Sequence, residues 1–164
     1  MMNKFILVDP EKCIGCRSCA LACSFEHDDE FNLSLTRISP LWMTEIGRFI
    51  PMTCQQCEEP LCLDVCPRKA VSADKKTSAI VVDEDLCIGC RACFLVCPFG
   101  VPVVHRNKGF MIKCDLCGGT PQCVEECSQQ ALSTVESDDA ALRKRREAAQ
   151  KLQALTEKIS EKAS

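Results

Sequence analysis

The cysteines of this chain, sixteen in all, fall into four runs of four. The third run, Cys87-Cys90-Cys93-Cys97 followed by Pro98, has the spacing C-x2-C-x2-C-x3-C-P. The first run has the same cysteine spacing, whereas the second and fourth runs are wider between their second and third cysteines. Thiolates at such short intervals can surround an iron–sulfur cluster, because the curled backbone brings three sulfurs to one centre. The spacing therefore predicts one-electron transfer rather than acid–base or nucleophilic catalysis.

Residues 54–97, which hold the second and third runs, resemble a complete two-cluster bacterial ferredoxin. In that pattern three cysteines of a run hold one cluster and the fourth reaches the other cluster. Residues 69–72 and 79–83 are predicted strands around a polar turn, and this hairpin would bring the two runs face to face. The first and fourth runs then remain to pair around this unit, as if one ferredoxin had been inserted into another.

Cross-ligation between paired runs predicts four [4Fe–4S] clusters and therefore four groups of ligands. Group A is Cys13, Cys16, Cys19 and Cys127; group B is Cys114, Cys117, Cys123 and Cys23; group C is Cys54, Cys57, Cys62 and Cys97; and group D is Cys87, Cys90, Cys93 and Cys66. Zinc also uses C-x2-C pairs, and disulfides are the other common use of so many cysteines. Neither alternative requires the third closely spaced cysteine of the first and third runs, or the proline after the second and third runs.

The runs predict an α+β fold of two nested ferredoxin-like modules, with short strands and helical turns around the clusters. The predicted parts are an outer module of residues 1–24 and 108–136, a cysteine-free insertion of residues 25–53, an inner module of residues 54–107, and an amphipathic helix of residues 137–164.

The insertion is predicted to hold two strands, residues 35–39 and 48–52, on either side of residues 40–47. It carries Trp42, which the sequence leaves open as a packing residue at the core or rim, or as a contact for a partner protein. His27 and His105 lack the spacing of metal ligands and are predicted to lie on the surface.

The last segment, residues 137–164, has no cysteine, proline or glycine and begins with a helix-capping signal at Ser137. Its apolar residues fall on one helical stripe and its basic residues lie mostly off that stripe. Two uses of such a helix remain open: it covers its own domain, or it mediates docking and self-association.

Composition excludes several classes of partner. A formal net charge of −3 argues against nucleic acid, because phosphate binding favours a basic face. No apolar run approaches the roughly 18 residues of a membrane span, and the apolar run near the N-terminus is too short for a secretion signal. We therefore expect a cytoplasmic protein without membrane contact. No phosphate-binding glycine loop or flavin fingerprint is present, so no catalytic site of its own is predicted.

Residues 2–135 resemble the iron–sulfur electron-transfer subunits of molybdenum and tungsten oxidoreductases. Residues 13–19, 51–58 and 113–119 look most like the small subunit of tungsten aldehyde oxidoreductase and benzoyl-coenzyme A reductase complexes, which are anaerobic systems. The resemblance implies that single electrons pass between a catalytic tungsten or molybdenum subunit and a flavoprotein, ferredoxin or hydrogenase. It also implies self-association, since some relatives with this plan form filaments.

Three other functions fit parts of the pattern. The chain could serve a formate dehydrogenase or hydrogenase complex, or act as a free-standing four-cluster ferredoxin. From a different class, a zinc-stapled module could assemble a complex without carrying electrons.

Overall fold

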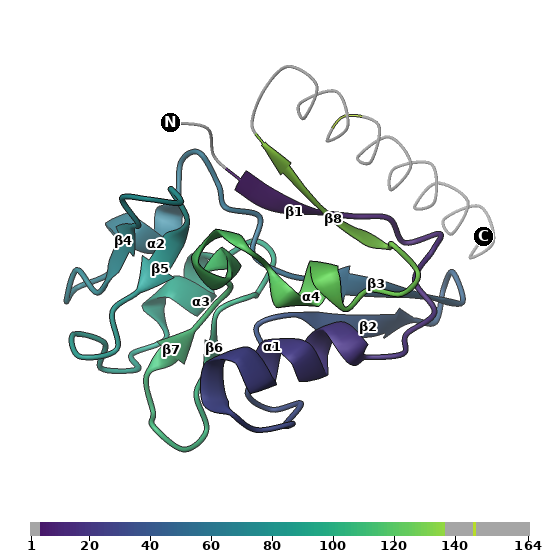
Figure 1. Cartoon of the computed structure of the whole chain (residues 1–164). Helices are drawn as coiled ribbons and strands as arrows, with labels where there is room; N and C mark the ends of the chain where they lie inside the picture. Colours follow the sequence, from purple (N-terminus) through teal and green to yellow (C-terminus); the bar gives the residue numbers. More distant parts are fainter. Residues whose placement is uncertain (1–3, 137–145, 147–164) are drawn as a thin grey trace.

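The computed structural model describes residues 4–136 and Arg146, so the helix predicted over residues 137–164 falls, apart from Arg146, outside the described residues (Figure 1). The strands are β1 (Lys4–Val8), β2 (Ser39–Met43), β3 (Arg48–Met52), β4 (Val71–Ala73), β5 (Ile80–Val82), β6 (Val103–Val104), β7 (Met111–Ile112) and β8 (Leu132–Glu136). The helices are α1 (Ser18–Asp28), α2 (Leu61–Asp64), α3 (Ala92–Val96), the 3-10 helix η1 (Leu116–Gly119) and α4 (Gln122–Glu125). None of these helices has both the length and the apolar character that a bilayer crossing requires.

The strands of the described part form four small antiparallel sheets, each of two strands. Three of them are local pairs, β2–β3, β4–β5 and β6–β7, whereas β1 pairs with β8 from the other end of the described chain. Lys4 lies opposite Glu136 and Val8 opposite Leu132. Figure 1 shows β4, β5, α2 and α3 on one side of the molecule, and β1, β8, α1 and α4 on the other. The predicted class of short strands and helical turns in an α+β arrangement is confirmed.

The apolar core is rich in sulfur. Apolar side chains from β1 and β8, among them Ile6 and Leu132, pack with buried cysteines that come from both ends of the described chain. The cysteines in this core are Cys19, Cys23, Cys114 and Cys123. A chain with so few large buried side chains has little apolar surface to stabilise it. Groups that bind to these sulfurs therefore contribute to holding the fold together.

The prediction for the insertion was wrong in its first strand. The structure places that strand at Ser39–Met43, and residues 35–38 have no strand structure. The strand runs through Pro40, which lies directly opposite Pro51 of β3. Two opposed prolines are tolerated because neither has an N–H group to lose from the ladder, and both strands are at the edge of their sheet.

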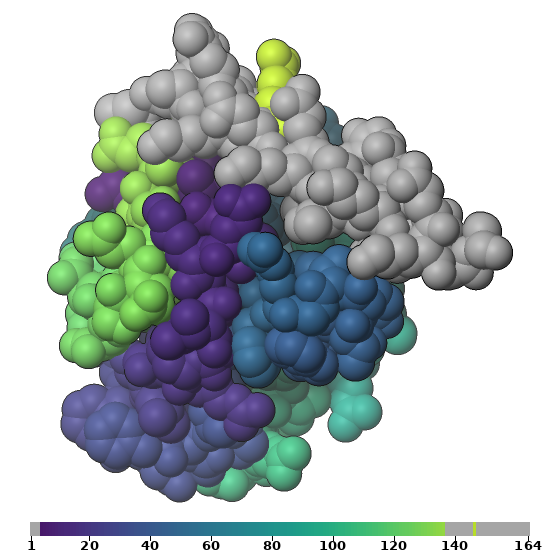
Figure 2. Space-filling model, turned by 90° about the vertical axis from the view of Figure 1, so that its right-hand side faces the viewer, coloured from purple at the N-terminus to yellow at the C-terminus, as the bar shows by residue number. Residues whose placement is uncertain are grey.

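Trp42 lies on this hairpin and is 52% exposed. Its ring packs against Phe49 of β3, with ring centroids 5.0 Å apart, and Phe49 lies against Gly15 in the loop before α1. Figure 2 shows the purple N-terminal segment between the blue segment that contains the hairpin and the green segment near β8. Trp42 therefore packs at the rim of the loop that carries the first cysteines, and half of its surface remains open to solvent.

Candidate metal centres

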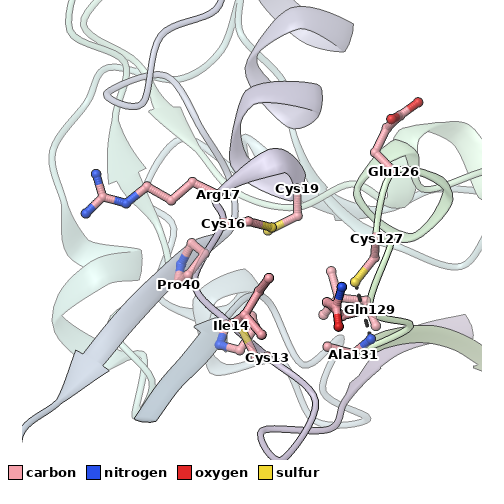
Figure 3. Close-up of a pocket in the computed structure, with 13 residues that line it drawn as sticks. Cys13, Ile14, Cys16, Arg17, Cys19, Pro40, Glu126, Cys127, Gln129 and Ala131 are labelled. Carbon is pink, nitrogen blue, oxygen red and sulfur yellow. Dashed lines mark hydrogen bonds between the residues drawn. The ribbon is translucent and has the colours of Figure 1, made fainter. Parts of the chain in front are cut away.

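Group A surrounds a hollow beside the start of α1. Cys13, Cys16 and Cys19 come from the loop before α1 and its first turn, and Cys127 comes from the segment after α4. One proline from each strand of the β2–β3 hairpin lines another side. The hollow measures about 340 Å3, part of it open to solvent, and Figure 3 shows the cysteine side chains around it. The fold thus brings together cysteines of the first and fourth runs.

Group D surrounds a second hollow, of about 320 Å3. Cys87, Cys90 and Cys93 lie in the loop before α3 and in α3 itself, and Cys66 follows α2. The arrangement repeats that of group A, with three cysteines from one loop and a fourth from the segment after a short helix. The shared cysteine spacing of the first and third runs therefore corresponds to a shared local structure.

The loops of groups A and D share one backbone conformation. Gly15 has a φ of 72° and Arg17 a φ of 65°, while Gly89 and Arg91 both have a φ of 64°. A glycine adopts this left-handed conformation without strain. At Gly89 a side chain is also excluded by space, because a β-carbon there would overlap the carbonyl oxygen of Gly109. Each loop consequently curls tightly enough to place its cysteines around one centre before the helix begins.

Mutual electrostatic effects between thiols identify the other two groups. Burial raises the pKa of Cys123, and the charges of its three group B partners raise it further. Burial also raises the pKa of Cys62, and the charges of its three group C partners act in the same direction. Cys23, Cys114 and Cys123 also belong to one buried cluster, which places three group B thiols together.

Single pairs of cysteines connect each group to the next. In each pair, burial is the main cause that raises the pKa of one cysteine, and the charge of the other cysteine raises that pKa further. The pairs are Cys19 with Cys123, Cys54 with Cys114, and Cys62 with Cys93. The packing agrees with this: Cys19, Cys114 and Cys123 belong to one buried cluster against which Cys54 packs, and α2, which carries Cys62, contacts α3, which carries Cys93.

Backbone N–H groups donate to several of the cysteine sulfurs. The pairs, all with a distance of 3.3 Å between nitrogen and Sγ, are Ala131 with Cys127, Ala70 with Cys66, Arg37 with Cys23, and Met111 with Cys87. The first two pairs have the same spacing of four residues in equivalent segments. A hydrogen bond to sulfur favours the thiolate over the thiol, and the thiolate is the form that binds metal.

Burial has the opposite effect on the enclosed thiols. It raises the pKa of Cys19 and of Cys114 to about 12. Without metal these thiols keep their protons at neutral pH, and a metal must displace the protons when it binds. Metal binding is therefore coupled to proton release at the centre of the molecule.

Residues 46–137 match a family described as a 4Fe–4S dicluster domain, and residues 12–71 match a second family with the same description. The chain belongs to the 4Fe–4S dicluster family. Its cofactors are accordingly [4Fe–4S] clusters, and two dicluster domains with sixteen cysteines are consistent with four of them.

Two relatives of this dicluster protein are subunits of oxidoreductases. It is 45% identical over 125 residues to the polyferredoxin-like subunit of aliphatic sulfonate oxidoreductase from Pyrococcus furiosus, covering 76% of this chain and 72% of that subunit. It is 37% identical over 143 residues to the B subunit of the anaerobic dimethyl sulfoxide reductase of Escherichia coli, covering 76% of this chain and 69% of that subunit. The dicluster protein is thus an iron–sulfur electron-transfer subunit of an oxidoreductase complex.

A solved structure has a similar fold. The active-site complex BamBC of benzoyl-coenzyme A reductase, determined with benzoyl-CoA, matches with a TM-score of 0.51 and 23% identity, covering 91% of this chain and 89% of the matched one. At this level of identity the similarity concerns the fold alone.

Closely spaced cysteines, sixteen in all, supply the thiolate sulfurs that hold [4Fe–4S] clusters. Backbone N–H groups directed at the sulfurs also suit a cluster that carries negative charge.

The prediction that the two histidines lie on the surface was wrong. His105 is 1% exposed, and its Nδ1 accepts hydrogen bonds from the backbone N–H groups of Asn107 and Lys108, each at 3.2 Å. Its Nε2–H therefore donates to Asp28 Oδ1 at 2.8 Å. The histidine connects the end of α1 to the turn between β6 and β7.

His27 lies beside group B. Its Nδ1 donates to the carbonyl oxygen of Cys23 at 2.8 Å and its Nε2 donates to Asp115 Oδ1 at 2.9 Å. Burial opposes the charged form, but these hydrogen bonds raise the pKa of His27 to about 10. Ligand atoms of His27, Asp115 and Cys117 lie within 4.8 Å of one another. Because Cys117 belongs to group B, these three side chains are part of the group B site. The sequence does contain a signal for this contact: Cys23 and His27 are four residues apart in a predicted helical turn, which places them on the same face.

The polar side chains between the groups were also missed. Gln56 is buried inside the loop between Cys54 and Cys57, and Lys113 is buried directly before Cys114. Both positions are next to ligands in the sequence, which is a weak signal because most such neighbours are exposed. Their contacts across the molecule become visible only in the fold.

Proposed function

We propose that the chain carries four [4Fe–4S] clusters in series, held by groups A, B, C and D. The observation that carries this proposal is that each group of four cysteines is drawn from two different runs. Residues 1–24 and 108–136 would form the outer of two nested ferredoxin-like modules, and residues 54–107 the inner one. Residues 25–53 are an insertion whose hairpin lines the group A hollow.

Each bound cluster supplies one-electron chemistry at nearly unchanged geometry. The chain's own residues hold the sulfurs, direct N–H groups at them and enclose them with apolar side chains. The order of the cysteine groups gives a path from A through B and C to D. Cys16 of group A, Cys57 of group C and Cys90 of group D are exposed, so the path reaches the surface at both ends and at group C.

The proposed partners lie at these two ends. One is a catalytic subunit with a tungsten or molybdenum cofactor, of the aldehyde oxidoreductase kind, and the other is a flavoprotein, ferredoxin or hydrogenase. Two points support the proposal. Relatives of the chain are subunits of oxidoreductases, and every cysteine of the chain has a place in one of the four groups of ligands. The chain itself would have no catalytic site, and cysteines that form no disulfide bonds suit the reducing cytoplasm.

Iron and sulfide analysis of anaerobically purified protein tests the cluster content. We expect about sixteen iron atoms per chain, four for each cluster, with broad absorption in the visible range that decreases on reduction. A colourless protein with stoichiometric zinc would overturn the proposal in favour of a structural zinc module.

The variant Cys127→Ser tests the assignment of ligands. We expect it to damage the cluster of Cys13, Cys16 and Cys19 and to leave the other three, so that iron falls to about twelve atoms or one cluster converts to a three-iron form. The neighbouring change Ser128→Ala is the control and should keep all the iron. Damage confined to the cluster of Cys114, Cys117 and Cys123 would contradict the cross-ligation.

Copurification of the native complex tests the partners. A larger subunit that contains tungsten or molybdenum is expected. A partner with a nickel–iron centre and no such cofactor would identify a hydrogenase complex instead.

A further inference from the structure

Lys113 carries a buried positive charge at the junction between groups B and C. The side chain follows β7 and directly precedes Cys114, and only 4% of the residue is exposed. Its ammonium group donates hydrogen bonds to the carbonyl oxygen of Ile80 in β5 and, at 3.5 Å, to that of Cys114. Both contacts are with neutral acceptors, so they solvate the charge without neutralising it.

Gln56 completes this junction. Its Nε2 donates to the same Cys114 carbonyl oxygen at 2.9 Å, and its Oε1 accepts from the backbone N–H of Ile80 at 2.8 Å. Because Gln56 lies between Cys54 and Cys57, the group C loop, β5 and the start of the fourth run meet around the Lys113 ammonium. The charge is therefore held in place from three parts of the chain.

A buried charge is costly unless an opposite charge lies nearby. The other buried cation of the described residues, Arg37, has such a partner in Asp28, at 3.3 Å. For Lys113, the ion pairs within residues 4–136 provide no carboxylate. The loop between Cys54 and Cys57 reaches this ammonium through Gln56, which shares the Cys114 carbonyl oxygen with it, so the negative charge that Lys113 faces is that of the group C ligands.

We propose that the Lys113 ammonium is the counter-charge of the cluster held by Cys54, Cys57, Cys62 and Cys97, and that it raises the reduction potential of this cluster. This inference rests on the proposed function. When an electron moves from the neighbouring cluster to this one, the neighbour is oxidised and this cluster is reduced, with no bond made or broken. The reduced cluster carries one more negative charge, so a fixed cation beside it favours reduction.

A consequence is that the group C cluster differs from the other three in its reduction potential. Electrons that enter at group A or at group D would collect at the junction between the two modules. Lys113 is thus a positioning and tuning residue, which acts on the cluster without ligating it.

The test is a redox titration of the full-length, anaerobically reconstituted protein, followed by electron paramagnetic resonance and visible absorption. In Lys113→Met, one midpoint potential should fall by about 59 mV, which is a tenfold change in the one-electron equilibrium. Lys113→Gln is a second neutral variant, retains an N–H donor and should give the same fall. Lys113→Arg keeps the charge and should keep the potential. The affected signal is assigned to group C by its loss in Cys97→Ser.

Two further variants separate charge from structure. Gln56→Met removes hydrogen bonds at the same junction but no charge, and Lys75→Met removes a charge from an exposed turn. Lys75→Met should leave the potential within a twofold change of the equilibrium, and Gln56→Met should shift it by less than Lys113→Met does. Equal shifts in Gln56→Met and Lys113→Met, or four unchanged potentials in both neutral variants, would overturn the inference. Wild-type protein with fewer than four clusters would instead overturn the proposed function.

Discussion

His27 shows how one side chain beside the ligands is held in a single charge state. Its two ring nitrogens donate to a carbonyl oxygen and to the Asp115 carboxylate. These contacts leave the ring protonated at neutral pH, and they lower the pKa of Asp115 to about 2 although burial opposes this. The result is a fixed ion pair next to group B, close to the backbone of one of its ligands, Cys23.

The His27 pair predicts a pH dependence of stability. The pKa of His27 rises from an ordinary 6.5 to about 10 on folding. Its contribution is therefore complete below pH 6.5, decreases above it and is lost as the pH rises through about 10. We expect His27→Gln to lower the urea midpoint for loss of the cluster absorbance at pH 7 by clearly more than at pH 9.5.

The wild-type protein measured at both pH values is the reference for this comparison. A difference between variant and wild type that stays constant from pH 7 to pH 9.5 would show that the charge of His27 does not stabilise the fold.

At the scale of elements, Asp28 joins α1 to two other segments. Its carboxylate lies 3.3 Å from the Arg37 guanidinium, 2.8 Å from His105 Nε2 and 3.6 Å from the Lys108 ammonium. The side chains of Asp28, Arg37 and His105 are almost fully buried. One carboxylate thus connects the end of α1 with the insertion and with the turn between β6 and β7.

The change Asp28→Asn should weaken this joint. It leaves the Arg37 charge buried without its partner, which costs about 3 kcal/mol. We expect the urea midpoint for cluster loss to fall by roughly 1 M or more. Asp29→Asn is the matched control, because Asp29 is exposed and has a left-handed backbone that asparagine also tolerates. If both variants lose stability equally, the Asp28 contacts are not what stabilises this region.

The pairing of β1 with β8 predicts a second effect at this scale. Ile6 is buried against cysteines of groups A and B, whereas the next residue, Leu7, points to the other face of the strand and is half-buried. Ile6→Thr should therefore cost about 2 kcal/mol and cause loss of iron from the group A and B clusters first. Iron content after mild urea treatment should fall toward about eight atoms in Ile6→Thr and stay higher in Leu7→Thr. Uniform loss from all four groups would count against two modules.

The elements also show why some features followed from the sequence and others did not. The loops around Gly15 and Gly89 were predictable, because closely spaced cysteines and a glycine impose one local conformation. The second strand of the insertion, residues 48–52, was predicted correctly, whereas the first was placed wrongly because the sequence pattern ended it before Pro40, and proline is tolerated in this edge strand. The burial of His105 depends on Asp28, 77 residues away in the sequence, and no local pattern reports such a contact.

At the scale of the whole molecule, strand pairing decides which runs of cysteines meet. β1 pairs with β8, which brings the first and fourth runs together. β4 pairs with β5 in the segment between the second and third runs, which brings those two runs together. Gln56, inside the second run, and Lys113, directly before the fourth run, both donate to the carbonyl oxygen of Cys114, which connects the two pairs of runs.

Of the two uses that the sequence leaves open for residues 137–164, self-association can be tested separately from cluster binding. The apolar stripe of this segment, which includes Leu152 and Leu155, is the feature that would pair with another surface. Removal of the segment from Ser137 onward should leave about sixteen iron atoms per chain and lower the mass measured by light scattering. In the full-length chain, Leu155→Glu should reduce the mass in the same way, while Lys158→Glu, which lies off the stripe, should not. An unchanged mass in both the truncated chain and Leu155→Glu would show that assembly, if it occurs, uses residues 4–136.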